Sequence, residues 1–416
     1  MIKNLLLPVF LLFSLATLAQ QGTASPYSFY GIGEIKFKGA AENRLMGTVA
    51  VFPDSIHINM QNPASYSSLK LTTFTVGGSF NSSKFTTYRE TENAQRSTVD
   101  YLAVGLPVGK KIGVAFGLIP YSSVGYRIRS VDPINGTIRK YNGTGGLNKA
   151  FVGLGYKINS DFSVGADFSY NFGKVETTNI VYVPGDQFGT EEMDNSDLSG
   201  VNFNLGAMYK TKIHKKYDFY GSLAFTPQSN VTSDNERILG TIVFADDYTP
   251  GIIEALDTQK TKVTIKLPSK FAFGAGFGKE RKWLVGTEIT LQQTSNFGNR
   301  FTDISNATYE NSIKYAVGGY YIPNYTSFSS YLSKVTYRAG FRYENTGLVL
   351  NNETIRDYAV SGGFGFPLGG TFSNLNMGVE YGRKGTAKAL LVEENYLNVI
   401  FSLSLNDQWF VKRRYD

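Results

Sequence analysis

Apolar and polar residues alternate with a period of two along most of this chain. In residues 162–173 every second position is apolar, with serine, glycine, aspartate, asparagine and similar small or polar residues between. The same alternation recurs in residues 335–344, 375–382 and 397–406. Because successive side chains of a strand point to opposite faces, this period predicts β-strands. The sequence therefore predicts an all-β protein.

Two features distinguish a membrane barrel from a soluble β-sandwich, whose strands can also alternate. The strands run to about ten or more residues, whereas soluble strands average about five or six. Many apolar faces also end in an aromatic residue, which suits the girdle at a lipid–water boundary; examples are Tyr170, Phe172, Tyr209, Tyr343 and Tyr381. After residue 20, no apolar run approaches the roughly 20 residues of a membrane-spanning helix. We expect a transmembrane antiparallel β-barrel.

The pattern divides into about fourteen strands, an even number as in bacterial single-chain barrels. They are centred near residues 75, 102, 115, 153, 167, 205, 222, 272, 288, 317, 338, 361, 377 and 400. The connections after the second, fourth, sixth and eighth strands are tight, whereas those between them are long and polar: 84–96, 123–148, 175–199, 229–266 and 295–312. We expect periplasmic turns, external loops and periplasmic termini, with a hairpin inside 229–266.

The first residues predict export. Lys3 precedes an apolar stretch from Leu5 to Leu18, and Thr17 and Ala19 lie three and one residues before a cut that leaves Gln20 first. The predicted organisation is a signal peptide at 1–19, an N-terminal plug at 20–68 and a barrel at 69–416. An exported barrel is expected in the outer membrane of a Gram-negative bacterium.

Residues 26–68 lack strand alternation, yet they are too apolar for a disordered tail. They could form a periplasmic extension or a plug folded into the barrel. A fourteen-strand barrel encloses space that a narrow eight-strand barrel lacks, and an empty lumen would leak. These considerations favour the plug.

Composition excludes several kinds of chemistry. Cysteine is absent, so disulfides, thiolate zinc sites and a lipoprotein anchor are excluded. The net charge of +7 comes from small dispersed groups rather than a nucleic-acid-binding stripe. The two histidines, His57 and His214, have no local triad partners. We expect no enzymatic activity and no cofactor.

Acidic residues gather in two of the predicted external loops: Glu191, Glu192, Asp194 and Asp197 in one, Asp246 and Asp247 in the other. Oxygen-rich loops can bind calcium, but the ordered spacing of an EF-hand is missing. Solvated loop charge is the favoured reading, and no metal site is predicted.

Short motifs in a fixed order resemble one membrane-protein family. Asn62-Pro63-Ala64 stands just before the first strand. The other motifs are Ser25-Pro26-Tyr27-Ser28, Gly31-Ile32-Gly33, Arg44-Leu45-Met46-Gly47, residues 120–126, Leu267-Pro268-Ser269 and residues 409–412. Over essentially the whole mature chain, this set resembles the FadL/TodX-type (OmpP1/FadL-like) outer-membrane channels for hydrophobic compounds.

The resemblance implies a fourteen-strand barrel with an N-terminal hatch. It implies passive uptake of long-chain fatty acids or other hydrophobic molecules, which leave sideways through an opening in the wall. The ligand-binding and gating residues of the hatch would be Asn62, Pro63, Ala64, Phe29, Leu45 and Met46.

The same resemblance places a kink of the third strand at Gly117 and Pro120. Proline lacks a donor for the strand ladder, so a break there is physically sensible. The alternative is that the strand ends at Ile119 and Pro120 begins an external loop.

Two functions remain open at this stage. The favoured one is a hatch-gated channel whose partners are the lipid bilayer and a fatty-acid-like ligand. The alternative is a non-catalytic accessory subunit of a larger outer-membrane complex for protein secretion or outer-membrane protein assembly. In that case its partners include other outer-membrane proteins.

Overall fold

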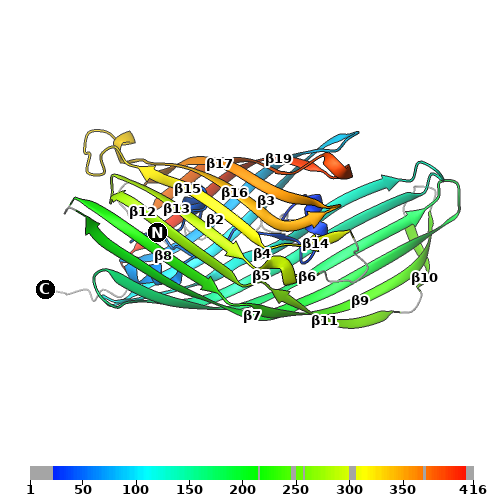
Figure 1. The fold of residues 1–416 in the computed structure, drawn as a ribbon, viewed down its shortest axis with the longest axis horizontal. Coiled ribbons are helices and arrows are strands. Elements are labelled where there is room, and N and C mark those ends of the chain that lie inside the picture. Colours follow the sequence, from blue (N-terminus) through cyan, green and yellow to red (C-terminus); the bar gives the residue numbers. More distant parts are fainter. Residues whose placement is uncertain are drawn as a thin grey trace, which may run out of the picture.

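Fourteen antiparallel strands form a closed barrel, as the alternation predicts (Figure 1). The computed structural model describes residues 22–213, 216–244, 250–255, 258–298, 306–368 and 372–408. The barrel strands are β2 (Thr72–Thr86), β3 (Thr91–Val108), β4 (Ile112–Val131), β5 (Ile138–Lys157), β6 (Phe162–Tyr182), β7 (Phe188–Ile213), β8 (Tyr217–Thr226), β12 (Lys270–Lys279), β13 (Trp283–Gln292), β15 (Ser312–Tyr321), β16 (Thr336–Leu350), β17 (Glu353–Pro367), β18 (Asn374–Gly385) and β19 (Glu393–Asp407). The last strand pairs with the first along its whole length and closes the barrel.

Apolar side chains face outward and polar side chains face the lumen, the reverse of a soluble protein. On β6, Phe168 and Tyr170 are 43% and 47% exposed, whereas Ser169 between them and Asp167 and Asn171 on either side are buried. Such an outer surface is stable only against lipid. No helix in the described parts of the chain is long and apolar enough to cross a membrane.

One sector of the barrel stands taller than the rest. β4 to β7 contain 20 to 26 residues each, whereas β12 and β13 contain ten. Figure 1 shows the long strands continuing to the right, where β10 (Pro250–Ala255) and β11 (Gln259–Leu267) lie. These two strands pair with β9 (Ser229–Phe244), and β9 in turn pairs with residues 188–200 of β7. The hairpin expected within 229–266 is therefore present.

The prediction of long external loops at 123–148 and 175–199 is wrong. Both stretches are mostly paired strand, and only residues 132–137 and 183–187 connect them. Beyond the bilayer a strand no longer needs an apolar outer face, so its alternation fades while its backbone hydrogen bonds continue. From the sequence alone, these polar ends of the strands could not be distinguished from loops.

The N-terminal segment (residues 22–71) lies inside the barrel. It contains the 3-10 helices η1 (Pro26–Phe29) and η2 (Pro63–Ser68), the short strand β1 (Glu34–Ile35) and the helix α2 (Ala41–Arg44). Its polar groups bond to strands on all sides of the lumen: Ser25 to Glu394, Gly47 to Ser361, Ala50 to Glu288, Asn62 to Ala207 and Leu223, and Glu42 to Asn376. The remaining short elements are η3 (Thr294–Asn296), β14 (Ala307–Tyr309), η4 (Leu332–Lys334) and η5 (Lys388–Leu390).

The apolar side chains of this segment form much of the buried core. Met46, Val49, Val51 and Phe52 pack in one cluster against the wall residues Tyr220, Leu284 and Ala316. Tyr66 and Met60 are fully buried in another cluster. Burying this much apolar surface inside the lumen fixes the segment there.

Candidate functional site: a luminal cavity beside a gap in the wall

A cavity of about 370 Å³ lies between the N-terminal segment and the barrel wall. Its lining combines aromatic rings with charged groups. Tyr27, Phe37 and Tyr121 contribute rings, whereas Glu34 and Lys384 are among the charged residues. Binding sites for small molecules usually combine apolar surface with a few placed polar groups. This cavity is more highly charged than a pocket for a pure hydrocarbon requires.

The barrel wall is incomplete next to this cavity. β3 and β4 pair at only seven positions, Leu102–Val108 with Ile112–Leu118. By contrast, β4 and β5 pair at nineteen positions. Residues 91–101 of β3 pair only with β2, and residues 119–131 of β4 have no partner on β3. We call this separation of the two strands the β3–β4 gap.

The predicted kink residues lie where this gap begins, on either side of Leu118, the last residue of β4 that pairs with β3. Gly117 still pairs with Ala103, and a Cβ added to it would lie 2.3 Å from the carbonyl oxygen of Leu102. Pro120 lies two residues beyond the last β3–β4 pair, at a bulge where the pairing of β4 with β5 shifts. β4 continues to Val131, so the alternative that the strand ends before Pro120 is wrong.

The cavity reaches the gap from the inside. Asp100 and Tyr101 of β3 line it on one side, and Ile119 and Pro120 of β4 line it on the other. Asp100 is itself the extra residue of a bulge in the β2–β3 pairing. Irregular backbone on both strands thus marks the place where they separate.

Strand β1 of the N-terminal segment occupies the edge of β4 that β3 leaves free. Glu34 and Ile35 pair with Ser123 and Ser122, and the Lys36 amide donates to the Tyr121 carbonyl oxygen at 2.9 Å. Gly33 approaches at a φ of +97°, where an added Cβ would lie 2.6 Å from the Ser123 carbonyl oxygen. Only glycine suits this approach.

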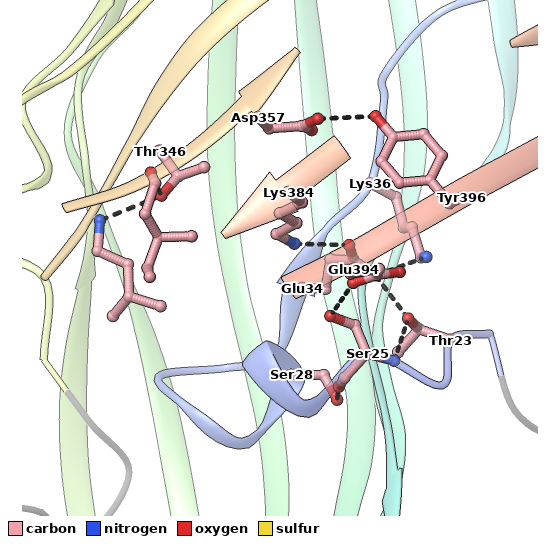
Figure 2. A network of polar contacts seen from close by, with 12 residues as sticks. Thr23, Ser25, Ser28, Glu34, Lys36, Thr346, Asp357, Lys384, Glu394 and Tyr396 are labelled. Carbon is pink, nitrogen blue, oxygen red and sulfur yellow. Dashed lines mark hydrogen bonds and ion pairs between the residues drawn. The ribbon is translucent and has the colours of Figure 1, made fainter. Parts of the chain in front are cut away.

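A polar network holds β1 in place (Figure 2). The Glu34 carboxylate lies 2.8 Å from the Lys384 ammonium of β18 and 3.1 Å from that of Lys36. The Thr23 hydroxyl donates to the same carboxylate at 2.6 Å. Burial alone would raise the pKa of Glu34, but the two lysines hold it well below its usual range. The carboxylate is therefore charged and fixed.

Arg44 makes a second connection between the segment and the wall. Its guanidinium lies 3.4 Å from Asp100 of β3 and 3.1 Å from Glu380 of β18. Because these are charged groups away from bulk water, removing one partner leaves the other buried and unpaired.

Five of the six predicted hatch residues are buried and Phe29 is partly buried, and none of the six lines the large cavity. Asn62 caps η2 by accepting from the Ala64 amide at 3.1 Å, and its own amide donates to Ala207 and Leu223 of the wall. Phe29 packs edge-on against Tyr126 and Tyr141. Pro63, Ala64, Leu45 and Met46 pack within the luminal core. Their roles in binding or gating remain predictions.

Within the N-terminal segment, His57 lies between two carboxylates. Its Nδ1 is 2.9 Å from Asp54, and its Nε2 is 3.5 Å from Glu42. Burial lowers the pKa of His57, but Asp54 and Glu42 raise it more, so the net pKa is raised. The pKa of Asp54, which burial would raise, falls to about 2 beside His57.

The acidic cluster on β7 is bonded to an arginine. Arg237 of β9 lies 2.7 Å from Asp194 and 3.1 Å from Glu192. In the described residues, no group of three or more His, Asp or Glu side chains is placed to hold a metal ion. The signal-peptide prediction, His214, Asp246 and Asp247 lie outside the described residues.

Solved structures with this fold include a hydrocarbon channel and a toluene transporter. The CymD monoaromatic hydrocarbon channel aligns with 92% of this chain and 99% of its own, at 13% identity and a TM-score of 0.58. A Pseudomonas aeruginosa FadL homologue aligns over 91% and 100%, at 13% identity and a TM-score of 0.62. The Pseudomonas putida toluene transporter TodX aligns over 91% and 100%, at 12% identity and a TM-score of 0.61. No curated protein matches the chain in sequence.

The fold implied by the resemblance to FadL/TodX-type channels is confirmed, and these structural neighbours are transport channels rather than enzymes. The lipid-facing surface and the fold make the protein an outer-membrane β-barrel. A family model described as BamG matches residues 1–416. The chain therefore belongs to the BamG family.

Proposed function

We propose that this protein is a non-enzymatic outer-membrane channel for hydrophobic or amphipathic small molecules, long-chain fatty acids among them. In this proposal the N-terminal segment is the hatch, and cargo leaves sideways through the β3–β4 gap. The observation that carries the proposal is that the cavity reaches the gap, where β1 takes the edge of β4.

Transfer energetics favour a sideways exit. Each CH₂ group moved from water into an apolar phase contributes about 0.8 kcal/mol. A sixteen-carbon chain therefore gains on the order of 10 kcal/mol by entering the bilayer rather than the aqueous periplasm. A route that ends in the wall avoids exposing the chain to water.

Opening this route requires β1 to leave β4. The two residues of β1 pair with the strand, and the Lys36 amide adds one bond. The Ser122 hydroxyl and the Gly125 amide of β4 also donate to the Ile32 carbonyl oxygen and the Ser28 hydroxyl. Each such hydrogen bond contributes about 1 kcal/mol net, so the backbone contacts alone form a weak closure. The ion pair between Glu34 and Lys384 would then act as the latch.

A reversible disulfide tests this proposal. Ile35 and Ser122 are direct partners across β1 and β4, and opposed residues in an antiparallel pair lie close enough for a disulfide. In this cysteine-free chain, Ile35→Cys/Ser122→Cys should block uptake of a labelled fatty acid when oxidised and restore it when reduced. A control pair, Leu106→Cys/Val114→Cys, joins β3 to β4 where they already pair and should transport in both states. Equal uptake by the oxidised and reduced gate pair would refute hatch gating at β1.

One observation supports the second candidate, the accessory subunit: one sector of the barrel is taller than the rest. β7, β9 and β11 continue the sheet well past the short strands, and they expose a polar surface with lysines such as Lys260 and Lys262. A channel needs no such sheet, whereas a subunit of a larger complex would use it for contacts. Native mass spectrometry after mild detergent extraction distinguishes the two, because a stoichiometric protein partner without fatty-acid uptake supports the subunit.

A further inference from the structure

Six lysines line the large cavity; Lys36 and Lys384 pair with Glu34, and the other four come from four different elements. Lys38 comes from the N-terminal segment, Lys149 from β5, Lys270 from β12 and Lys314 from β15. The charge of Lys38 acts on both Lys149 and Lys270, and that of Lys314 acts on Lys270. The four ammonium groups therefore form one electrostatic cluster, which we call the lysine cluster.

Nearby carboxylates balance only part of this charge. Asp167 pairs with Lys38 at 3.6 Å. Glu288 is buried near Lys270 and Lys314 and accepts a hydrogen bond from the Ala50 amide at 2.9 Å. Glu344, the other acid near Lys270, lies 3.8 Å from the Arg342 guanidinium. Arg342 also lies 2.8 Å from Asp357 and 3.7 Å from Glu380, so it does not neutralise Glu344. Four lysines against Asp167, Glu288 and Glu344 still leave an excess of positive charge.

Lys149 shows most clearly that a partner is missing. Only 3% of its surface is exposed, yet among the described residues no carboxylate lies within ion-pair distance of it. Its ammonium instead lies 4.9 Å from the centre of the Tyr121 ring, and that of Lys314 lies 6.0 Å from the Phe37 ring. An aromatic face compensates a buried ammonium less well than an anion does.

We propose that the lysine cluster binds an anionic phosphate group. The group would be free phosphate or the headgroup of an amphiphile whose apolar part contacts Phe37 and Tyr121, both of which line the cavity. A negatively charged group matches the excess positive charge of the cluster, and ammonium groups hold phosphate as point charges. A role in uptake rests on the proposed function, whereas binding itself does not.

Calorimetry on the full-length protein in a non-ionic detergent tests this proposal. The probes are inorganic phosphate, dihexanoyl phosphatidic acid and, as a zwitterionic control, dihexanoyl phosphatidylcholine. We expect one equivalent of the phosphate probe to bind. Lys149→Met and Lys270→Gln should each weaken binding about tenfold, as expected for the loss of one charge-assisted contact. Lys110→Gln, which alters an exposed turn lysine, should bind like the unmodified protein.

Binding of both phosphate and phosphatidic acid supports a site for the phosphate group itself. Binding of phosphatidic acid alone supports a headgroup site. Binding of neither, or equal binding of phosphatidylcholine, would overturn the proposal. If Lys149→Met does not fold, the Lys270→Gln variant provides the test, because Lys270 is only half-buried. An unchanged affinity of Lys270→Gln for the phosphate probe would contradict the assignment. Because binding is measured without transport, its failure is distinguishable from failure of the channel.

Discussion

Glu34 of the N-terminal segment and Lys384 of β18 form an ion pair inside the barrel, with 2.8 Å between Oε1 and Nζ (Figure 2). Glu34 belongs to the two-residue strand that occupies the free edge of β4. The same side chain therefore connects the cover of the β3–β4 gap to β18, which β19, β2 and β3 separate from β4 in the sheet. In the proposed channel, this pair sets how readily the cover leaves.

Glu34→Gln should loosen the hatch. It removes one charge of a buried pair and leaves Lys384 with only the more distant carboxylates of Glu394 and Asp357. Breaking a buried pair typically costs about 3–5 kcal/mol, and these carboxylates reduce that cost. We expect a lower thermal midpoint and a higher conductance in planar bilayers. Glu236→Gln is the matched control, because its partner Lys260 is exposed and such surface pairs contribute little. Equal conductance of Glu34→Gln and the control would show that the pair is not a latch.

The His57 site predicts a pH-dependent hatch. Because the folded pKa of His57 is raised, its contribution is fully present below the unfolded value of about 6.5 and is lost as pH rises through the folded pKa. Asp54, with a pKa of about 2, contributes above its unfolded value and loses its contribution only as pH falls toward 2. Conductance should therefore rise between pH 6 and pH 9.

His57→Gln is the control for this pH dependence. Glutamine keeps hydrogen-bonding capacity but cannot titrate, so its conductance should stay constant between pH 6 and pH 9. A rise in the variant as steep as in the unmodified protein would mean that another group is responsible.

The alternating turns predict an orientation in the membrane. Cysteines placed at Asp186 and Ser160 in this cysteine-free chain lie in exposed connections at opposite ends of the barrel. An impermeant maleimide added to intact cells should label position 186 and spare position 160. Labelling of position 160 alone would reverse the assigned orientation.

Strand number was predictable because lipid imposes a strict alternation on every crossing segment. The residues of β6, from Phe162 to Phe172, show the pattern without exception, and exposed and buried side chains alternate from Ala166 to Phe172 in the structure. Strand length was not predictable, since residues such as those of 190–199 face no lipid and carry no such constraint. Their pairing depends on β9, which comes some forty residues later.

The candidate site was less predictable than the fold. Pro120 could be singled out because proline in a strand is unusual, and it does lie at the gap. Lys38, Lys149, Lys270 and Lys314 gave no signal, because more than forty residues separate each from the next and only barrel closure brings them together. The role of Glu34 could not be predicted from the sequence either, since its partner Lys384 is 350 residues away.

Uptake of labelled palmitate by cells carrying Pro120→Val tests sideways exit most directly. Valine restores a backbone donor at the gap, and one added ladder bond of about 1 kcal/mol that favours closure should lower uptake about fivefold. Pro107→Val, in the part of β3 that already pairs with β4, should leave uptake unchanged. The account predicts reduced uptake in Pro120→Val alone, with both variants inserted and heat-modifiable on gels. Unchanged uptake by a correctly inserted Pro120→Val barrel would contradict it.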